Sequence, residues 1–222
     1  IRSSVILRQG KVKEISLRLK NKWQLDLNEL FNSISDKTKM VFINSPSNPT
    51  GWMLTENEQE EIIAYIRKKN CWLIADEVYH QIVYDREVAP SFLQHAKPDD
   101  KLIVINSSSK SFNMTGWRIG WISHPEFLGE HIAKLVQIST TGVPEFLQDG
   151  FFSALINYKS IVKDVKNGLK QSRDLVFERT KNWKKIYMPE TNAAFYSFFR
   201  VKDMNNSIEY AKYLIEKTQV GL

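Results

Sequence analysis

The sequence of 222 residues contains a single cysteine, Cys71, so it has neither an internal disulfide nor a zinc site built from several cysteines. It also lacks any apolar run close to the ~20 residues that a membrane-spanning helix needs. The formal net charge is +6, but the basic residues are spread along the chain and form no dense run interleaved with aromatics. A nucleic-acid partner is therefore not indicated.

The remaining composition is that of an ordinary globular protein, with 42% hydrophobic and 25% charged residues. A chain of this length can bury a sizeable core. It begins at Ile1 without an initiator Met, and its first residues do not resemble a signal peptide. We therefore expect a soluble, cytoplasmic protein whose chain does not begin at its natural start.

Predicted strands and helices alternate along the chain. Apolar runs at residues 40–43, 71–75 and 102–105 predict buried strands, and a capping box at the start of residues 55–69 predicts a helix. This alternation indicates an α/β fold with a mostly parallel central sheet and helices on both faces. Further strands are expected at 5–7, 14–19 and 194–201, an apolar run follows at 119–122, and further helices are expected at 27–34, 126–139, 145–157, 160–183 and 207–217.

Each of the three buried strands is followed at once by a polar cluster. In parallel α/β sheets the carboxyl ends of the strands open onto one edge, where ligands bind. Taken singly, the polar residues could form a turn, cap a helix or pack in the core, but their shared placement favours one site. The residues expected to converge there are Asn48, Asp76, Tyr79, Ser107, Ser109, Lys110 and Arg118.

The chemistry of this set matches pyridoxal phosphate. A lysine amine can form a Schiff base with the cofactor aldehyde. A carboxylate at a strand end can keep the ring nitrogen protonated. A phenol and an amide can hydrogen-bond the ring hydroxyl, and hydroxyls with an arginine suit a phosphate.

Three motifs carry a family resemblance. They are NSPSNPTG at 44–51, ADEVYHQIVYD at 75–85 and SSSKSFNMTGWRIGW at 107–121. Together they resemble the class I and II aminotransferases, the fold-type I pyridoxal phosphate enzymes. PEFLQ at 144–148 and NAAFYSFF at 192–199 are weaker echoes of the same family. Ser108 departs from the pattern, because the family usually has an apolar or a small residue there.

The resemblance implies catalytic roles for three residues. Lys110 would form the Schiff base with the cofactor and move the proton at the substrate α-carbon. Asp76 would pair with the ring nitrogen. Tyr79, with Asn48 beside it, would hydrogen-bond the ring hydroxyl.

The resemblance also implies a phosphate site formed by Ser107, Ser109 and Arg118, and no metal site. The implied activity is transfer of an amino group between an amino acid and a 2-oxo acid by a homodimer. A carbon–sulfur lyase, an acyl-transferring synthase or a truncated non-catalytic remnant are the alternatives.

We expect two parts in the chain. Residues 1–156 would form most of a large cofactor-binding domain that is incomplete at its start. Residues 157–222 would form a connecting helix and part of a smaller α+β domain. The family's upstream phosphate turn and stacking aromatic, and its downstream carboxylate-binding arginine, have no counterpart in this sequence. We therefore expect a fragment that is inactive by itself.

Overall fold

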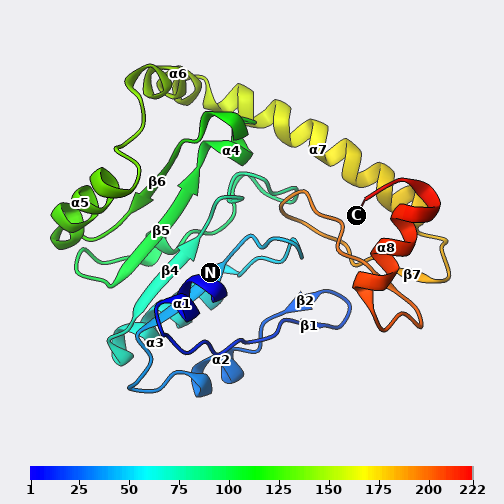
Figure 1. Ribbon diagram of the computed structural model, residues 1–222, viewed down its shortest axis with the longest axis horizontal. Coiled ribbons are helices and arrows are strands. Elements are labelled where there is room, and N and C mark those ends of the chain that lie inside the picture. Colours follow the sequence, from blue (N-terminus) through cyan, green and yellow to red (C-terminus); the bar gives the residue numbers. More distant parts are fainter. Residues whose placement is uncertain (222) are drawn as a thin grey trace.

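The computed structural model describes residues 1–221, and at its centre lies a four-stranded sheet (Figure 1). The strand order is β3-β4-β5-β6, and β3, β4 and β5 run parallel, whereas β6 runs antiparallel to β5. This confirms the α/β fold with a mostly parallel sheet. The strands are β3 (Met40–Asn44), β4 (Trp72–Asp76), β5 (Leu102–Ser107) and β6 (Gly120–Ser123).

The helix α3 (Glu56–Lys69) connects β3 to β4 and starts at the predicted capping box. The Glu58 backbone N–H donates to Thr55 Oγ1 at 3.3 Å, and the Thr55 N–H donates to Glu58 Oε2 at 2.7 Å. The helix ends at Asn70, which adopts the left-handed conformation with a φ of 51°. Both ends of this crossover are therefore fixed by local sequence.

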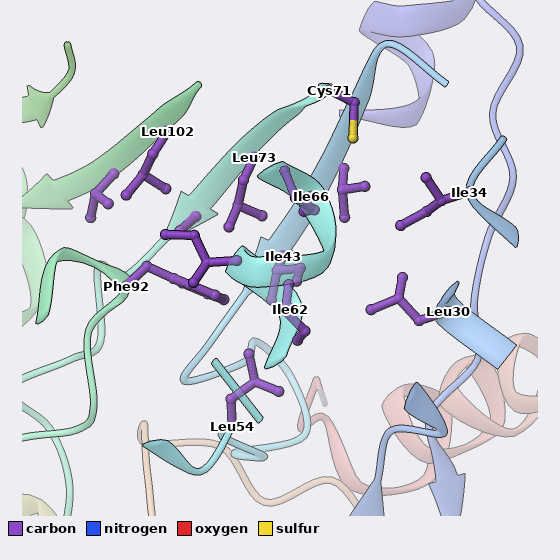
Figure 2. Packing of buried hydrophobic residues seen from close by; sticks show 14 residues of the cluster. Leu30, Ile34, Ile43, Leu54, Ile62, Ile66, Cys71, Leu73, Phe92 and Leu102 are labelled. Atoms are coloured by element: carbon purple, nitrogen blue, oxygen red, sulfur yellow. The ribbon is translucent and has the colours of Figure 1, made fainter. Parts of the chain in front are cut away.

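The main core lies between α3 and the sheet (Figure 2). Ile62 of α3 is fully buried, and Leu73 of β4 is 1% exposed. Phe92, from the 3-10 turn η1 (Phe92–His95) that follows β4 in the chain, completes the cluster and is also 1% exposed. Cys71 is a small member of the same cluster. Each large side chain buried in this way stabilises the fold by roughly 1.5–3 kcal/mol relative to an exposed one.

The remaining helices follow the predicted order, except for the short helix at residues 108–111, which was not predicted. Asp26 caps α2 (Leu27–Ser33) by accepting from the Glu29 N–H at 3.1 Å. The long helix α7 leads away from the sheet toward a small hairpin and the last helix (Figure 1). The bounds are α4 (Ser108–Ser111), α5 (Gly129–Ser139), α6 (Glu145–Ile156), α7 (Tyr158–Thr180) and α8 (Ser207–Thr218), with 3-10 turns at η1 (Phe92–His95), η2 (Thr115–Trp117) and η3 (Glu126–Leu128).

The expected strand at residues 5–7 is wrong, because these residues end the helix α1 (Arg2–Leu7). A short apolar run fits either period, and α1 contains no buried residue that would reveal a packed face. Of the strand expected at 14–19, only β1 (Arg18–Leu19) forms, in an antiparallel pair with β2 (Trp23–Gln24).

The expected strand at 194–201 is also mostly wrong. Its first residue, Ala194, has a φ of 57°, which breaks an extended backbone. Only β8 (Arg200–Val201) forms, paired with β7 (Ile186–Tyr187). Residues 194–199, which precede β8, form no β-strand. They include Phe195 and Tyr196, which are described with the site below.

Within residues 1–221, no helix combines the length and the apolar character that crossing a membrane requires.

Candidate functional site

The carboxyl ends of the three parallel strands lie at one edge of the sheet. Asn44 at the end of β3 is in register with Asp76 of β4, and Asp76 is in register with Ile105 of β5. The Asn44 side-chain amide also donates to the Asp76 carbonyl oxygen at 3.1 Å. The three predicted motifs therefore begin side by side, as the parallel sheet requires.

Lys110 lies in α4, immediately after β5. Its Nζ is 6.0 Å from the centroid of the Tyr79 ring and 5.6 Å from the centroid of the Phe195 ring. Both distances are within the range of cation–π attraction. Among the residues that the structure describes, no carboxylate forms an ion pair with this lysine. The amine thus lies beside two aromatic rings that also contact each other, with centroids 5.4 Å apart.

Asp76 ends β4 and is half-buried. Burial raises the pKa of its carboxyl, and a 3.3 Å hydrogen bond from the Val78 N–H to Oδ1 acts in the opposite direction. A carboxylate with a desolvation cost and one long hydrogen bond is stabilised by a cationic partner. The Asp76 carboxylate is therefore suited to pair with a cationic group such as the protonated ring nitrogen of pyridoxal phosphate.

Tyr79 is 3% exposed, and its hydroxyl is hydrogen-bonded to the hydroxyl of Tyr196. Burial, and next this contact with Tyr196, raise the pKa of the Tyr79 phenol, whereas a side-chain hydrogen bond with Asn48 lowers it. The Asn48 backbone N–H is itself fixed by the Asn44 side-chain oxygen at 2.7 Å. Tyr79 and Asn48 therefore lie close together.

Ser107 and Ser109 also lie together, because the Ser109 N–H donates to Ser107 Oγ at 3.1 Å. The Arg118 guanidinium is exposed and donates to the Thr115 carbonyl at 2.9 Å. Thr115 Oγ1 in turn donates to the Ser109 carbonyl at 3.1 Å. Within residues 1–221, no direct hydrogen bond joins the guanidinium to either serine, and Thr115 is the link between them.

The position of Arg118 depends on the local backbone. Its φ of 56° is left-handed, and it directs the chain from η2 into β6. Gly120 follows opposite Ser107, where a Cβ would come within 2.9 Å of the Asn106 carbonyl oxygen. The short spacing from Lys110 to Gly120 therefore needs a tight return of the chain, which a larger residue at 120 would hinder.

Two residues at this site were not among the predicted site residues, Phe195 and Tyr196. Both follow α7 and contact Tyr79, with ring centroids at 5.4 Å and 5.6 Å and nearly perpendicular planes. The only signal for them was the NAAFYSFF motif at 192–199. Its contact with the sheet edge depends on the path of α7, which the motif does not encode.

The assembled groups fit the binding of pyridoxal phosphate. The amine of Lys110 lies beside the Tyr79 phenol, and the carboxylate of Asp76 ends the neighbouring strand at the same sheet edge. These are functional groups that this cofactor uses. In the described part of the chain, no group of three or more His, Cys, Asp or Glu side chains could hold a metal ion.

Comparison with known sequences gives one family. Residues 1–221 match the profile of "Aminotransferase class I and II". A probable aspartate aminotransferase of Methanocaldococcus jannaschii is 33% identical over 94% of this chain and 55% of its own length. Aromatic-amino-acid aminotransferase 2 of Thermococcus litoralis is 31% identical over 98% of this chain and 56% of its own length. The chain thus spans about 55% of the length of these relatives.

Solved structures agree with this result. The aspartate aminotransferase of Thermotoga maritima superposes with a TM-score of 0.87 at 30% identity, covering 98% of this chain and 56% of that one. The aromatic aminotransferase of Pyrococcus horikoshii gives a TM-score of 0.89 at 29% identity, covering 98% and 59%. The similarity in fold therefore extends over nearly all of the present chain.

Proposed function

The chain belongs to the class I and II aminotransferase family, and on that premise we propose that the protein carrying it transfers an amino group between an amino acid and a 2-oxo acid. Members of this family depend on pyridoxal phosphate. One observation carries the proposal. Lys110 Nζ lies beside the Tyr79 ring, at the sheet edge where Asp76 ends the neighbouring strand.

Bound pyridoxal phosphate supplies the electron sink of the reaction. Lys110 would attach the cofactor through Nζ and then carry a proton to and from the substrate α-carbon. The rings of Tyr79 and Phe195 beside Nζ would exclude water from that proton transfer.

Asp76 would hold the proton on the ring nitrogen. The raised pKa of its carboxyl reflects a charge that burial disfavours. A cationic N–H at Oδ1 or Oδ2 would offset this desolvation and keep the carboxylate ionised at neutral pH. The ring would then stay protonated, which its role as an electron sink requires.

Tyr79 and Asn48 would donate to the cofactor ring hydroxyl. The raised pKa of the Tyr79 phenol keeps its proton in place, so it acts as a hydrogen-bond donor at neutral pH. Ser107, Ser109 and Arg118 would bind the phosphate, with the guanidinium turning from the Thr115 carbonyl toward the anion.

We also propose the two-part division at residues 1–156 and 157–222. The start of α7 at Tyr158 supports it, because this helix leads from the sheet to the small β7–β8 pair. We further propose a cytoplasmic homodimer, as the family resemblance implies. Sedimentation equilibrium of the complete protein tests the dimer, and a single-subunit mass would contradict it.

The activity is tested with the complete protein that carries this chain. The purified protein should take up pyridoxal phosphate with a new visible absorption band. It should also produce a new amino acid from a 2-oxo acid, measured by chromatography over a panel of amino donors that includes aspartate and aromatic amino acids. Cofactor uptake without amino transfer to any 2-oxo acid would contradict the proposal.

A further inference from the structure

The hydroxyl of Tyr79 is hydrogen-bonded to that of Tyr196, a residue that follows α7 in the chain. The two rings meet edge to face, with centroids 5.6 Å apart and an interplanar angle of 75°. Tyr196 is not one of the residues expected to touch the cofactor. Its contact nevertheless places the Tyr196 phenol against the Tyr79 phenol, which is assigned to the ring hydroxyl of the cofactor.

The segment that carries Tyr196 is bonded to the chain just after Tyr79. The Ala194 N–H donates to the Ile82 carbonyl at 2.9 Å, and the Tyr84 N–H donates to the Asn192 carbonyl at 2.9 Å. The Tyr84 hydroxyl also donates to the Ala194 carbonyl at 2.6 Å. These bonds fix the backbone two residues before Tyr196.

A second set of contacts supports the same segment. The Arg173 guanidinium lies 4.4 Å from the centroid of the Tyr84 ring and donates to the Thr191 carbonyl at 3.1 Å. Ala193 is fully buried. A Cβ on Gly51, at the end of the first motif, would meet the Ala193 carbonyl oxygen at 2.7 Å. Residues 191–194 thus pack against the loop that ends at Gly51 and against residues 82–84, and they give Tyr196 a rigid base.

The direction of the hydroxyl pair follows from counting protons. A phenol has one O–H to donate, and its oxygen can accept. With Tyr79 as the donor, the bond between the two tyrosines raises the pKa of the Tyr79 phenol. When Tyr79 donates to a ligand instead, that bond has to be donated by Tyr196. A hydrogen bond accepted at its oxygen strengthens the donation of the Tyr79 hydroxyl, because consecutive hydrogen bonds polarise one another.

We propose that Tyr196 is a positioning residue, whose hydroxyl orients and polarises the Tyr79 hydroxyl toward the ring oxygen of pyridoxal phosphate. This inference rests on the proposed function. It assigns to the NAAFYSFF segment a task beyond packing. Because a residue of this kind acts through Tyr79, its effect has to disappear when the Tyr79 hydroxyl is absent.

The test uses four forms of the complete protein: wild type, Tyr196→Phe, Tyr79→Phe and the double variant. Two quantities are measured, the dissociation constant for pyridoxal phosphate and the pH midpoint of the bound cofactor's visible absorption. Tyr196→Phe should weaken binding roughly 2- to 10-fold, the effect of losing one hydrogen bond. The pH midpoint should rise, because weaker donation disfavours a negative ring oxygen. In the Tyr79→Phe background the substitution should change neither quantity.

Tyr213→Phe is the matched control, because Tyr213 lies on α8 and is 52% exposed. Thermal denaturation of all forms checks that folding is retained. Two results would overturn the inference. One is a Tyr196→Phe protein that behaves like Tyr213→Phe. The other is an effect of equal size with and without the Tyr79 hydroxyl, which would indicate direct contact or general packing. If wild type itself fails to take up the cofactor, the proposed function fails instead.

Discussion

Lys110 Nζ lies 5.6 Å from the centroid of the Phe195 ring, although one residue follows β5 and the other follows α7. The ring shields one side of the amine, and the Tyr79 ring lies at 6.0 Å. Both rings therefore lie beside the amine, and no carboxylate within residues 1–221 forms an ion pair with it. The amine is therefore available to form a Schiff base.

The first prediction concerns Lys110→Ala. Loss of the amine removes both the covalent attachment and the proton carrier, so amino transfer should fall by at least about 100-fold. Borohydride reduction followed by intact mass measurement should show no covalent cofactor. Lys101→Ala is the control, because this lysine lies at the opposite end of β5, where its Nζ donates to the Asn70 carbonyl at 3.3 Å. Full activity of Lys110→Ala would contradict the assignment.

The parallel sheet edge could be predicted from the sequence because its signals are local. The apolar runs of β3, β4 and β5 are short, and a turn former or a polar cluster ends each of them. The Thr55 capping box fixes α3 between two of these strands. Once three strands are parallel, their motifs have to share an edge. Asn48, Asp76 and Lys110 could therefore be placed without knowledge of any long-range contact.

What could not be predicted depends on pairing across long distances. Whether residues 194–201 extend as a strand depends on the left-handed Ala194 and on the isolated bridge between Val83 and Ala193. Neither feature leaves a periodic pattern. Phe195 and Tyr196 were missed as site residues for the same reason, because α7 decides where their segment returns. The helix α1 was missed because a short apolar run is compatible with both periods.

The second prediction concerns Asp76→Asn in the cofactor-free protein. Burial raises the pKa of this carboxyl above its ordinary value of 3.8. Its contribution to stability is fully present below pH 3.8 and is lost as the pH rises through the folded-state pKa. At pH 7 the ionised group is therefore unfavourable, and Asp76→Asn should raise Tm by about 1–4 °C.

The same variant should lose amino transfer, because a neutral amide cannot hold the ring nitrogen's proton. Thermal scans at pH 7 and pH 4 test the first effect, and the gain in Tm should shrink at pH 4. Asp99→Asn is the control, because Asp99 is exposed. A lower Tm for Asp76→Asn at pH 7 would mean that the carboxylate has a stabilising partner within the chain.

The third prediction concerns the ion pair between Arg67 of α3 and Asp100. The guanidinium binds both carboxylate oxygens, at 2.7 Å and 2.6 Å, and the Asp100 side chain is 8% exposed. The hydrogen bond from Arg67 holds the pKa of Asp100 below its usual value. The resulting stability is present above the unfolded-state pKa and is lost as the pH falls through the folded-state pKa.

Arg67→Met should therefore cost about 1–3 kcal/mol at pH 7, because it leaves the Asp100 carboxylate without its partner. The cost should decline at acidic pH, where Asp100 is protonated in both states. Urea unfolding at several pH values measures this difference. Lys134→Met is the control, because the Lys134–Glu130 pair spans 3.7 Å and is largely exposed. An equal loss of stability at every pH would rule out the electrostatic explanation.

The last prediction compares two glycines. Gly51 ends the first motif with a φ of 65°, and a Cβ there would lie 2.7 Å from the Ala193 carbonyl oxygen and 2.9 Å from the Thr191 side chain. Gly51→Ala combines a left-handed backbone with a clash against the Ala193 carbonyl oxygen and the Thr191 side chain, so it should cost about 1–3 kcal/mol or more. Cofactor affinity should fall with it, since the same clash displaces Asn48.

Gly168 provides the opposite case. It lies inside α7, and a Cβ there would meet nothing within 4 Å. Gly168→Ala should stabilise the protein by about 0.5–1 kcal/mol, because alanine loses less backbone entropy in a helix. Urea unfolding of both variants gives the two signs in one experiment. If Gly51→Ala were as stable as Gly168→Ala, residues 191–194 would not pack against the Asn48 loop. The rigid base inferred for Tyr196 would then lose its main support.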